Sequence, residues 1–458
     1  MKIKFVLVLM VVATALGSVI ARAQTQSQAA QFAREGRALS ASQAKELETR
    51  VADNPEDLAA RTRLLGYYTS TALRTIGAEA TRDARRRHIL WFIEHHPESE
   101  TTSLSEITID PAGHALADPD GYQQAKAAWL AQIDRHKDDV TVLLHAARFF
   151  RLPDRALTLD LLKRGVRLSG PNPNAARELG YVYGITILGI TMLNGNGIPL
   201  KADPDLAGGA LAAQSIREVR ESSNYAVVVS AGATLSQYST FVSEALNGAV
   251  SQKALAEELL KKAGAMNQTD GASARSLADS YHLKWAGAQS PQDRASFARK
   301  ELEYAELAAN RSQANPDWYR TLLVRAAKAA VEAGELEKAQ RLANDALAQV
   351  GSRNDNTTGP VIHDAHVVLG RIDLAGGRVA GAKQHLLAAG RVTGGGSLTS
   401  FGPNMSLAKA LLERGERATV VKYLEECESF WSFQGTARQW ITTIERGGTP
   451  NFGANLIY

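Results

Sequence analysis

The residues best suited to hold a metal ion or transfer a proton are the histidines, and two of the ten share one helical face. His363 and His366 are three residues apart, which places both on the same side of a helix. A metal site would add a Cys, Glu or further His at a matching offset, and none stands there. We therefore predict no metal site and interpret both residues as half-exposed. His95 and His96 precede Pro97 at a helix end, where imidazoles interact favourably with the helix dipole.

Two serines stand three residues before a lysine, as the nucleophile does in penicillin-binding enzymes. They are Ser42 with Lys45 and Ser406 with Lys409. The Lys-Thr-Gly element that completes that site is missing. The glycine-rich stretch 393–397 has no lysine in the phosphate-binding position, so we interpret it as a flexible loop. The chain shows no catalytic constellation, and we expect neither an enzyme nor a cofactor.

Small residues recur at a fixed spacing near the C-terminus. This spacing gives more information about the secondary structure than the reactive side chains do. The three sets are Ala327, Gly334 and Ala346, then Gly370, Gly377 and Ala389, then Ala408, Gly415 and Cys427. The sets are offset by 43 and by 38 residues. Each places a small residue on one helix, a glycine at the following turn and a small residue on the next helix. Such spacing predicts helical hairpins that bury their faces by stacking, and therefore an α-solenoid.

The pattern resembles the tetratricopeptide repeat (TPR), which has a Leu-Gly pair on its first helix and an Ala early on its second. Leu369-Gly370 and Leu407-Ala408 occupy the place of that pair, and Ala339 and Ala382 lie five residues after their turn glycines. The resemblance covers 315–430. It implies an all-α, right-handed superhelical solenoid of stacked antiparallel helix pairs. The step of 43 exceeds the 34 residues of the family's unit because a polar loop, 351–360, separates two hairpins.

Apolar residues recur at helical spacing along almost the whole chain, and Pro and Gly divide it into segments. A helix is expected over 173–193, and loops over 99–120 and 194–204, the second being the best candidate boundary. The expected organisation is a signal peptide (1–23), a helical array with degenerate TPR-like units (24–193), Ala-rich hairpins (205–310), three clearer repeats (315–433), and a capping helix with a tail that packs back irregularly (434–458).

The first 23 residues have the pattern of a secretory signal peptide. Lys2 and Lys4 precede an uncharged run, and Ala21-Arg22-Ala23 is a small-x-small cleavage site, so the mature chain would begin at Gln24. We expect export to the periplasm or the extracellular space, with no membrane insertion after cleavage. The alternative is an uncleaved membrane anchor, because the apolar run is at the lower length limit for a spanning helix.

Charge and cysteine content argue against a nucleic-acid partner and against an internal disulfide. Lys2, Lys4 and Arg22 carry three of the four net positive charges, so the basic balance does not predict nucleic-acid binding. A cluster of basic residues beside Trp91 is interpreted as a solvated helix face with an aromatic core edge. It consists of Arg82, Arg85, Arg86 and Arg87. Because Cys427 is the one cysteine, the chain has no internal disulfide, and we predict that it is a small buried packing residue.

We expect a non-enzymatic scaffold that binds a protein or peptide partner on its concave face. In TPR units the residue after the small position of the first helix faces that groove. Here these residues are Lys328, Arg371 and Lys409, and the apolar residues four positions before them are Val324, Val367 and Met405. Three cations flanked by apolar side chains would suit an extended segment with acidic groups. The preceding unit interrupts the row with Asp279.

Two other classes remain open from the sequence. One is a hydrolase of envelope polymers with its site in 100–310, and the other is a self-associating envelope assembly factor. Neither the partner nor the oligomeric state follows from the sequence. A pocket of convergent titratable groups would favour the hydrolase, whereas a concentration-dependent size without any partner would favour the assembly factor.

Overall fold

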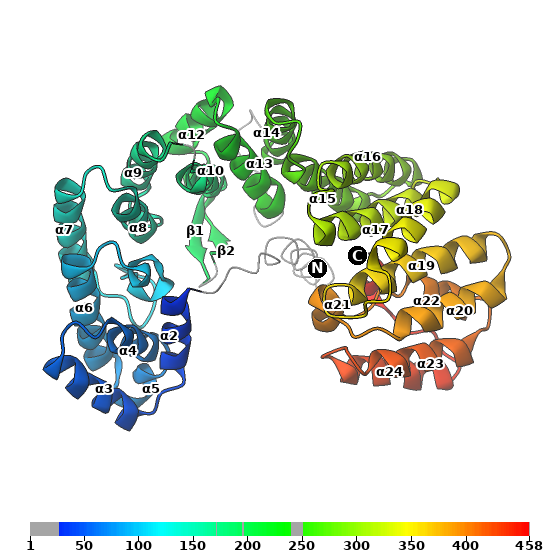
Figure 1. Ribbon diagram of the computed structural model, residues 1–458, viewed down its shortest axis with the longest axis horizontal. Coiled ribbons are helices and arrows are strands. Elements are labelled where there is room, and N and C mark those ends of the chain that lie inside the picture. The colour runs from blue at the N-terminus through cyan, green and yellow to red at the C-terminus, as the bar shows by residue number, and fades with distance from the viewer. Residues whose placement is uncertain (1–26, 171, 195–196, 240–250, 458) are drawn as a thin grey trace. The chain divides into compact units, whose positions relative to one another are not determined.

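The computed structural model describes residues 27–170, 172–194, 197–239 and 251–457 (Figure 1). The predicted signal peptide lies outside these ranges. Within them, no helix is both long enough and apolar enough to cross a membrane.

The chain forms two compact units. The N-terminal unit comprises the described residues of 22–234. Its elements are α2 (Gln28–Arg37), α3 (Ala41–Asp53), α4 (Leu58–Ser70), α5 (Ala72–Ile76), α6 (Ala78–His95), the 3-10 helices η1 (Glu100–Ser103) and η2 (Ser105–Ile107), α7 (Pro119–Arg135), α8 (Val140–Phe150), α9 (Arg155–Leu168), α10 (Asn174–Ile187), β1 (Ile190–Leu193), β2 (Pro199–Ala202), α11 (Pro204–Ala207), α12 (Ala210–Glu221) and most of α13 (Tyr225–Tyr238).

The C-terminal unit comprises the described residues of 235–240 and 250–458. Its elements, after the last residues of α13, are α14 (Gln252–Met266), α15 (Ala272–Gly287), α16 (Pro291–Asn310), α17 (Pro316–Glu332), α18 (Leu336–Val350), α19 (Gly359–Ala375), α20 (Val379–Gly390), α21 (Gly396–Phe401), α22 (Ser406–Leu412), α23 (Arg417–Cys427), α24 (Gln434–Glu445) and the 3-10 helix η4 (Gly453–Leu456).

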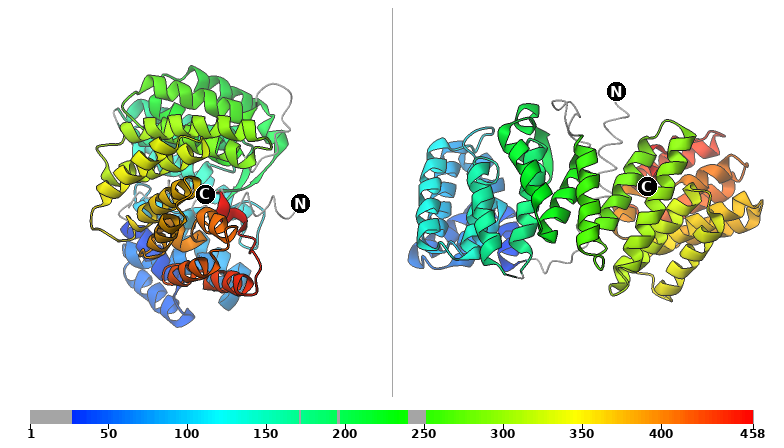
Figure 2. Two further views of the ribbon diagram at one scale, coloured as in Figure 1. Left: turned by 90° about the vertical axis from the view of Figure 1, so that its right-hand side faces the viewer. Right: turned by 90° about the horizontal axis from the view of Figure 1, so that it is seen from above.

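Consecutive helices pair and stack within each unit, which makes the chain an all-α solenoid. In the C-terminal unit α15 packs against α16, α16 against α17, and α17 against both α18 and α19 (Figures 1 and 2). In the N-terminal unit α8 pairs with α9, α9 with α10, and α10 with α12. The predicted fold class of stacked helix pairs is therefore confirmed.

The repeat hairpins turn at glycines for a reason that lies in the backbone. Gly334, Gly377 and Gly415 have φ of 81°, 74° and 83°. The amide after each glycine donates to the carbonyl five residues before that amide. These bonds are Glu335 N to Ala330 O at 2.8 Å, Arg378 N to Asp373 O at 2.8 Å, and Glu416 N to Leu411 O at 3.0 Å. This is the Schellman arrangement, which satisfies the last carbonyls of a helix and requires a left-handed residue.

The small residues of the repeat lie where neighbouring helices approach. Ala327, Ala346, Ala389, Ala408 and Cys427 are all completely buried. At Gly370, an added Cβ would lie 2.3 Å from a methyl carbon of Leu407, so any larger residue would force the Leu407 side chain to move. The prediction that these are buried packing positions, Cys427 included, is confirmed.

The segment 190–202 differs from its prediction. The expected helix over 173–193 ends at Ile187, because Gly189 turns the chain with φ of 63°. Strands β1 and β2 then pair antiparallel, so the predicted loop 194–204 contains the second strand of a hairpin. The two units also divide near residue 234 rather than in this loop. Antiparallel pairing of the two strands overrides the helical periodicity of this apolar run.

The loop after α6 and the C-terminal tail both pack onto helices. In the predicted loop 99–120, η1 and η2 interrupt the irregular chain. In the tail, Asn455 is buried; its side-chain amide donates to Phe401 O at 3.1 Å and Pro403 O at 3.0 Å, and its carbonyl accepts from Met405 N at 2.7 Å. The tail is thus an irregular cap, as its sequence predicts.

Two arginines of the α6 cluster, Arg85 and Arg86, are bonded rather than solvated, which corrects part of the sequence interpretation, whereas the Arg87 side chain is 60% exposed. Arg85 is 6% exposed and donates to Thr108 O at 2.7 Å and Glu106 O at 3.3 Å. Arg86 forms two hydrogen bonds with Asp118, both at 2.7 Å. Arg85 and Arg86 therefore hold the loop after α6 by satisfying its carbonyls and its carboxylate.

Candidate functional site

The predicted groove cations all have acidic partners in the chain. Lys328 Nζ lies 2.9 Å from Asp364 Oδ2, which joins α17 to α19. Arg371 Nη1 lies 2.5 Å from Glu332 Oε1, which joins the same two helices in the opposite sense.

Lys409 Nζ lies 2.5 Å from Glu413 Oε1, one turn further along the chain. Each predicted cation therefore has a carboxylate beside it with which an acidic ligand would have to compete.

The apolar half of the predicted site is wrong. Val324, Val367 and Met405 are 5%, 3% and 0% exposed, and they belong to the cores between helices. A partner on the surface cannot reach them. The physical reason is that α19 packs directly beside α17. A residue expected to be exposed on the first helix of one hairpin is therefore covered by the first helix of the next hairpin.

Asp279, which interrupts the predicted row, has the same role as the cations beside it. Its carboxylate forms an ion pair with Arg325, which joins α15 to α17. Ion pairs therefore link α15 to α17 and α17 to α19, and α17 supplies the cation in some of these pairs and the carboxylate in another. These pairs fix how the helices stack, and they leave no continuous positive stripe for a ligand.

The two candidate histidines, His363 and His366, have different surroundings. His363 is completely buried, not half-exposed; its Nε2 lies 2.9 Å from Tyr423 Oη and its Nδ1 2.8 Å from Asp364 Oδ1. His366 is half-buried, and its Nδ1 lies 3.0 Å from Nδ1 of His385. Among the described residues no group of three or more His, Cys, Asp or Glu side chains could hold a metal ion.

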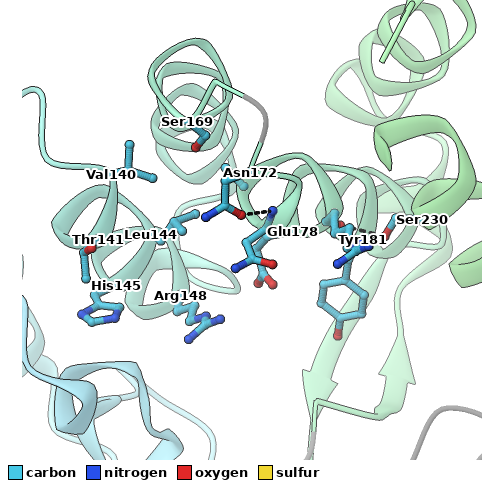
Figure 3. Close-up of a pocket in the computed structure, with 13 residues that line it drawn as sticks. Val140, Thr141, Leu144, His145, Arg148, Ser169, Asn172, Glu178, Tyr181 and Ser230 are labelled. Atoms are coloured by element: carbon cyan, nitrogen blue, oxygen red, sulfur yellow. Dashed lines mark hydrogen bonds between the residues drawn. The ribbon is translucent and has the colours of Figure 1, made fainter. Parts of the chain in front are cut away.

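A cavity of about 570 Å³ opens on the N-terminal unit between α8, α10 and α13 (Figure 3). Most of the side chains around it are polar. They are Val140, Thr141, Leu144, His145, Arg148, Ser169, Asn172, Asn174, Ala175, Arg177, Glu178, Tyr181 and Ser230. This is a cavity of the size of a typical ligand site, but with a wet and charged lining instead of an apolar one.

Helix geometry explains why these side chains converge. On α8, Thr141, His145 and Arg148 are spaced by four and three residues, so they share one face. Asn174, Glu178 and Tyr181 repeat that spacing on α10.

The starts of both helices are fixed by side-chain oxygens. Asp139 Oδ1 accepts from Thr141 N at 2.8 Å before α8, and Asn172 Oδ1 accepts from Asn174 N at 3.0 Å before α10. The two polar faces then form the walls of the cavity.

The electrostatic balance of the cavity is positive. Glu178, its one carboxylate, pairs with Arg151 at 3.4 Å. In the described part of the chain, neither Arg148 nor Arg177 forms an ion pair. Ser230 is engaged, since its hydroxyl donates to Arg177 O at 2.7 Å. Two cations to which no described residue offers an acidic partner therefore remain at the cavity.

His145 forms part of the wall. Its Nδ1 lies 3.0 Å from Pro97 O and 2.7 Å from Thr102 Oγ1. Because the carbonyl can only accept, we assign the proton to Nδ1, which leaves Nε2 as an acceptor. Burial lowers the pKa of His145, so the ring is neutral near pH 7.

The cavity residues were not predicted as a site, although the sequence contains one signal for them. In the otherwise apolar stretch from Val140 to Phe150, the polar residues Thr141, His145 and Arg148 recur on one helical face. A polar stripe on an apolar helix indicates a face that does not enter the core. What the sequence does not contain is the distance between α8 and α10, which decides whether that face is covered.

Comparison with known proteins finds only weak similarity. No protein-family model matches the chain, and no curated protein matches it. The solved structure of a human IFIT1 dimer with PPP-AAAA is 16% identical, with a TM-score of 0.36 over 92% of this chain and 99% of that chain. The human IFIT1 dimer with m7Gppp-AAAA is also 16% identical, with a TM-score of 0.35 over 88% and 85%.

A structure of the APC/C hetero-tetramer Cut9-Hcn1 is 11% identical, with a TM-score of 0.24 over 88% of this chain and 81% of that chain. Values this low carry no inference about ligands. The fold assignment rests on the packing of the chain's own helix pairs.

Proposed function

We propose that this protein is an exported, non-enzymatic scaffold that binds an acidic peptide segment of a protein partner. The binding site would be the cavity between α8 and α10. The observation that carries this proposal is the pair Arg148 and Arg177, two cations that form no ion pair with any described residue and lie beside a cavity of about 570 Å³. This site replaces the row of Lys328, Arg371 and Lys409, whose charges are already paired.

The cavity chemistry suits a peptide with carboxylates. Arginine forms paired, charge-assisted hydrogen bonds with carboxylate groups. The amide groups of Asn172 and Asn174 supply donors and acceptors suited to peptide backbone. An extended segment that lies across parallel first helices is a recurring mode of recognition by helical repeats.

The rival function, hydrolysis of an envelope polymer, would at this cavity use a hydroxyl nucleophile activated by His145. Thr102, the hydroxyl that contacts His145, is 1% exposed and lies behind the wall of the cavity. It cannot reach a substrate. The geometry therefore supports binding better than catalysis at this site.

The test is selection from a displayed library of random peptides with the full mature chain as bait. We expect the selected peptides to be rich in Asp and Glu. Their affinity should fall at least tenfold for the double variant Arg148→Glu, Arg177→Glu, which corresponds to about 1.4 kcal/mol. Selection without acidic enrichment would contradict the proposal.

The matched control is the double variant Arg135→Glu, Arg167→Glu, which makes the same change of charge at two exposed arginines of α7 and α9 outside the cavity. It should bind as the wild type does. An equal loss in both variants would show that only net charge matters. Concentration-dependent self-association without peptide binding would favour the assembly factor instead.

A further inference from the structure

A second cavity lies in the C-terminal unit, among α14, α15 and the end of α16. Its volume is about 180 Å³, well above the roughly 10–15 Å³ that one water molecule requires on the same measure. Leucines of all three helices form its apolar walls: Leu260, Leu277 and Leu307. The polar groups Ser273, Arg311, Lys261 and Tyr304 also line it.

Two buried polar atoms in this cavity have no partner. Ser273 is completely buried, and its Oγ makes no hydrogen bond with any described residue. Nη1 of Arg311, also shielded from solvent, makes none either. A buried donor without an acceptor destabilises a fold, so such atoms mark a place where a ligand or water supplies the missing bond.

Gly264 opens the space between these two atoms. A Cβ at position 264 would lie 3.2 Å from Ser273 Oγ and 3.9 Å from Arg311 Nη1. The hydroxyl and the guanidinium therefore converge on one point, and that point is empty of protein because residue 264 has no side chain. Glycine inside a helix otherwise lowers its stability, which makes its presence in α14 informative.

The charges around the cavity leave Arg311 without a counter-charge. In the described part of the chain Arg311 forms no ion pair. The nearby carboxylate of Glu257 is occupied by Lys261 and Lys284, each at 2.7 Å. At the start of α15, Asp270 Oδ1 accepts from Ala272 N at 2.9 Å, so this helix end is already capped and adds nothing to the site. Among the described residues that line the cavity, the two unsatisfied atoms are thus a guanidinium N–H, which only donates, and a hydroxyl, which can donate, and an oxyanion would satisfy both.

We propose that this cavity binds a small oxyanion of the phosphate type, with Arg311 as counter-charge and the Ser273 hydroxyl as hydrogen-bond donor. The oxyanion could be free phosphate or the phosphoryl group of a larger molecule that enters past Lys261, whose side chain is 54% exposed. This site is separate from the peptide cavity and does not depend on it.

The test is calorimetric titration of the full mature chain with inorganic phosphate, and separately with glycerol 3-phosphate, at constant ionic strength set by chloride. Phosphate should bind at one site. Arg311→Gln should weaken it at least tenfold. Arg299→Gln, an exposed arginine of α16 outside the cavity, makes the same charge change and should bind as the wild type does.

Two further variants separate the site from the fold. Gly264→Ala keeps both donors but fills the space between them, so it should abolish binding while the helix content is retained. Ser273→Ala removes an unsatisfied hydroxyl; it should raise the melting temperature of the phosphate-free protein and reduce the increment that phosphate adds. Tight binding of glycerol 3-phosphate would assign the site to a phosphoryl group, and its exclusion would assign it to free phosphate.

Three results would overturn the proposal. One is wild-type phosphate affinity in both Arg311→Gln and Gly264→Ala. The second is stabilisation by phosphate no greater than by chloride. The third is a crystal structure grown in phosphate with only ordered water between Arg311 and Ser273.

Discussion

At the scale of the residue, the packing of the helix pairs depends on buried positions that are occupied by very small side chains. Ala389 is completely buried in the core that joins α19 to α24. Cys427 takes the equivalent place one repeat later, and burial raises the pKa of its thiol, so it behaves as a small apolar residue. The requirement at both positions is small volume rather than any chemical group.

Ala389→Leu should therefore destabilise the C-terminal unit by about 1–3 kcal/mol, because the extra carbons overpack a core that cannot expand freely. Urea unfolding measures the change. Ala418→Leu, on the exposed side of α23, is the matched control and should change stability by less than about 0.5 kcal/mol. Equal stability of the two variants would show that Ala389 does not lie between closely packed helices.

His366 and His385 give the same unit a dependence on pH. Burial, with the neighbouring His385 charge second, lowers the pKa of His366 to about 4. The unfolded chain binds this proton near pH 6.5. Between these values the unfolded state carries more protons, so stability present above pH 6.5 is lost as pH falls toward 4.

We expect wild-type protein to lose about 1 kcal/mol more stability than His366→Gln between pH 7.5 and pH 5, allowing for solvent screening of a partly exposed pair. Urea unfolding at the two pH values measures this difference. His95→Gln, an exposed histidine of the other unit, should keep the wild-type pH dependence. The interpretation fails if His366→Gln loses stability as steeply as the wild type.

At the scale of the element, the sequence predicts the turns of the repeats correctly. It does not predict the surroundings of the expected groove residues Lys328 and Arg371. A left-handed residue at a helix end favours glycine so strongly that Gly334, Gly377 and Gly415 mark their turns directly. The partners of Lys328 and Arg371 depend on which helix lies beside α17. That neighbour, α19, begins beyond a polar loop, so local spacing contains no information about it.

The Schellman turns predict a specific effect of alanine. A Cβ at Gly377 would meet no atom within 4 Å, so the effect of Gly377→Ala comes from its positive φ alone. We expect a loss of about 1–2 kcal/mol in urea unfolding. Gly287→Ala has the same open surroundings without a positive φ and should be neutral or stabilising. If both variants behave alike, the backbone explanation is wrong.

At the scale of the whole molecule, the fold class and the repeat pattern followed from the sequence, whereas the cavity and the hairpin did not. Stacking requires small residues at fixed intervals, and these are visible as letters. The cavity between α8 and α10 arises because two polar faces stay apart, and the β1–β2 hairpin because two short strands pair; both are relations between segments that local spacing does not encode.

Export is a property of the whole chain that the described residues do not test. If the small pair Ala21 and Ala23 guides cleavage, the mature protein begins at Gln24. Mass spectrometry of protein from the native host should give that N-terminus. Recovery of chain beginning at Met1 in the membrane fraction would instead establish a retained anchor.

The most direct test of the central claim is a crystal structure of the mature chain bound to a peptide selected from the random library. We predict that a carboxylate of the peptide lies within hydrogen-bond distance of Arg148 or Arg177, in the cavity between α8 and α10. A peptide bound elsewhere, with both arginines left in solvent, would contradict the account.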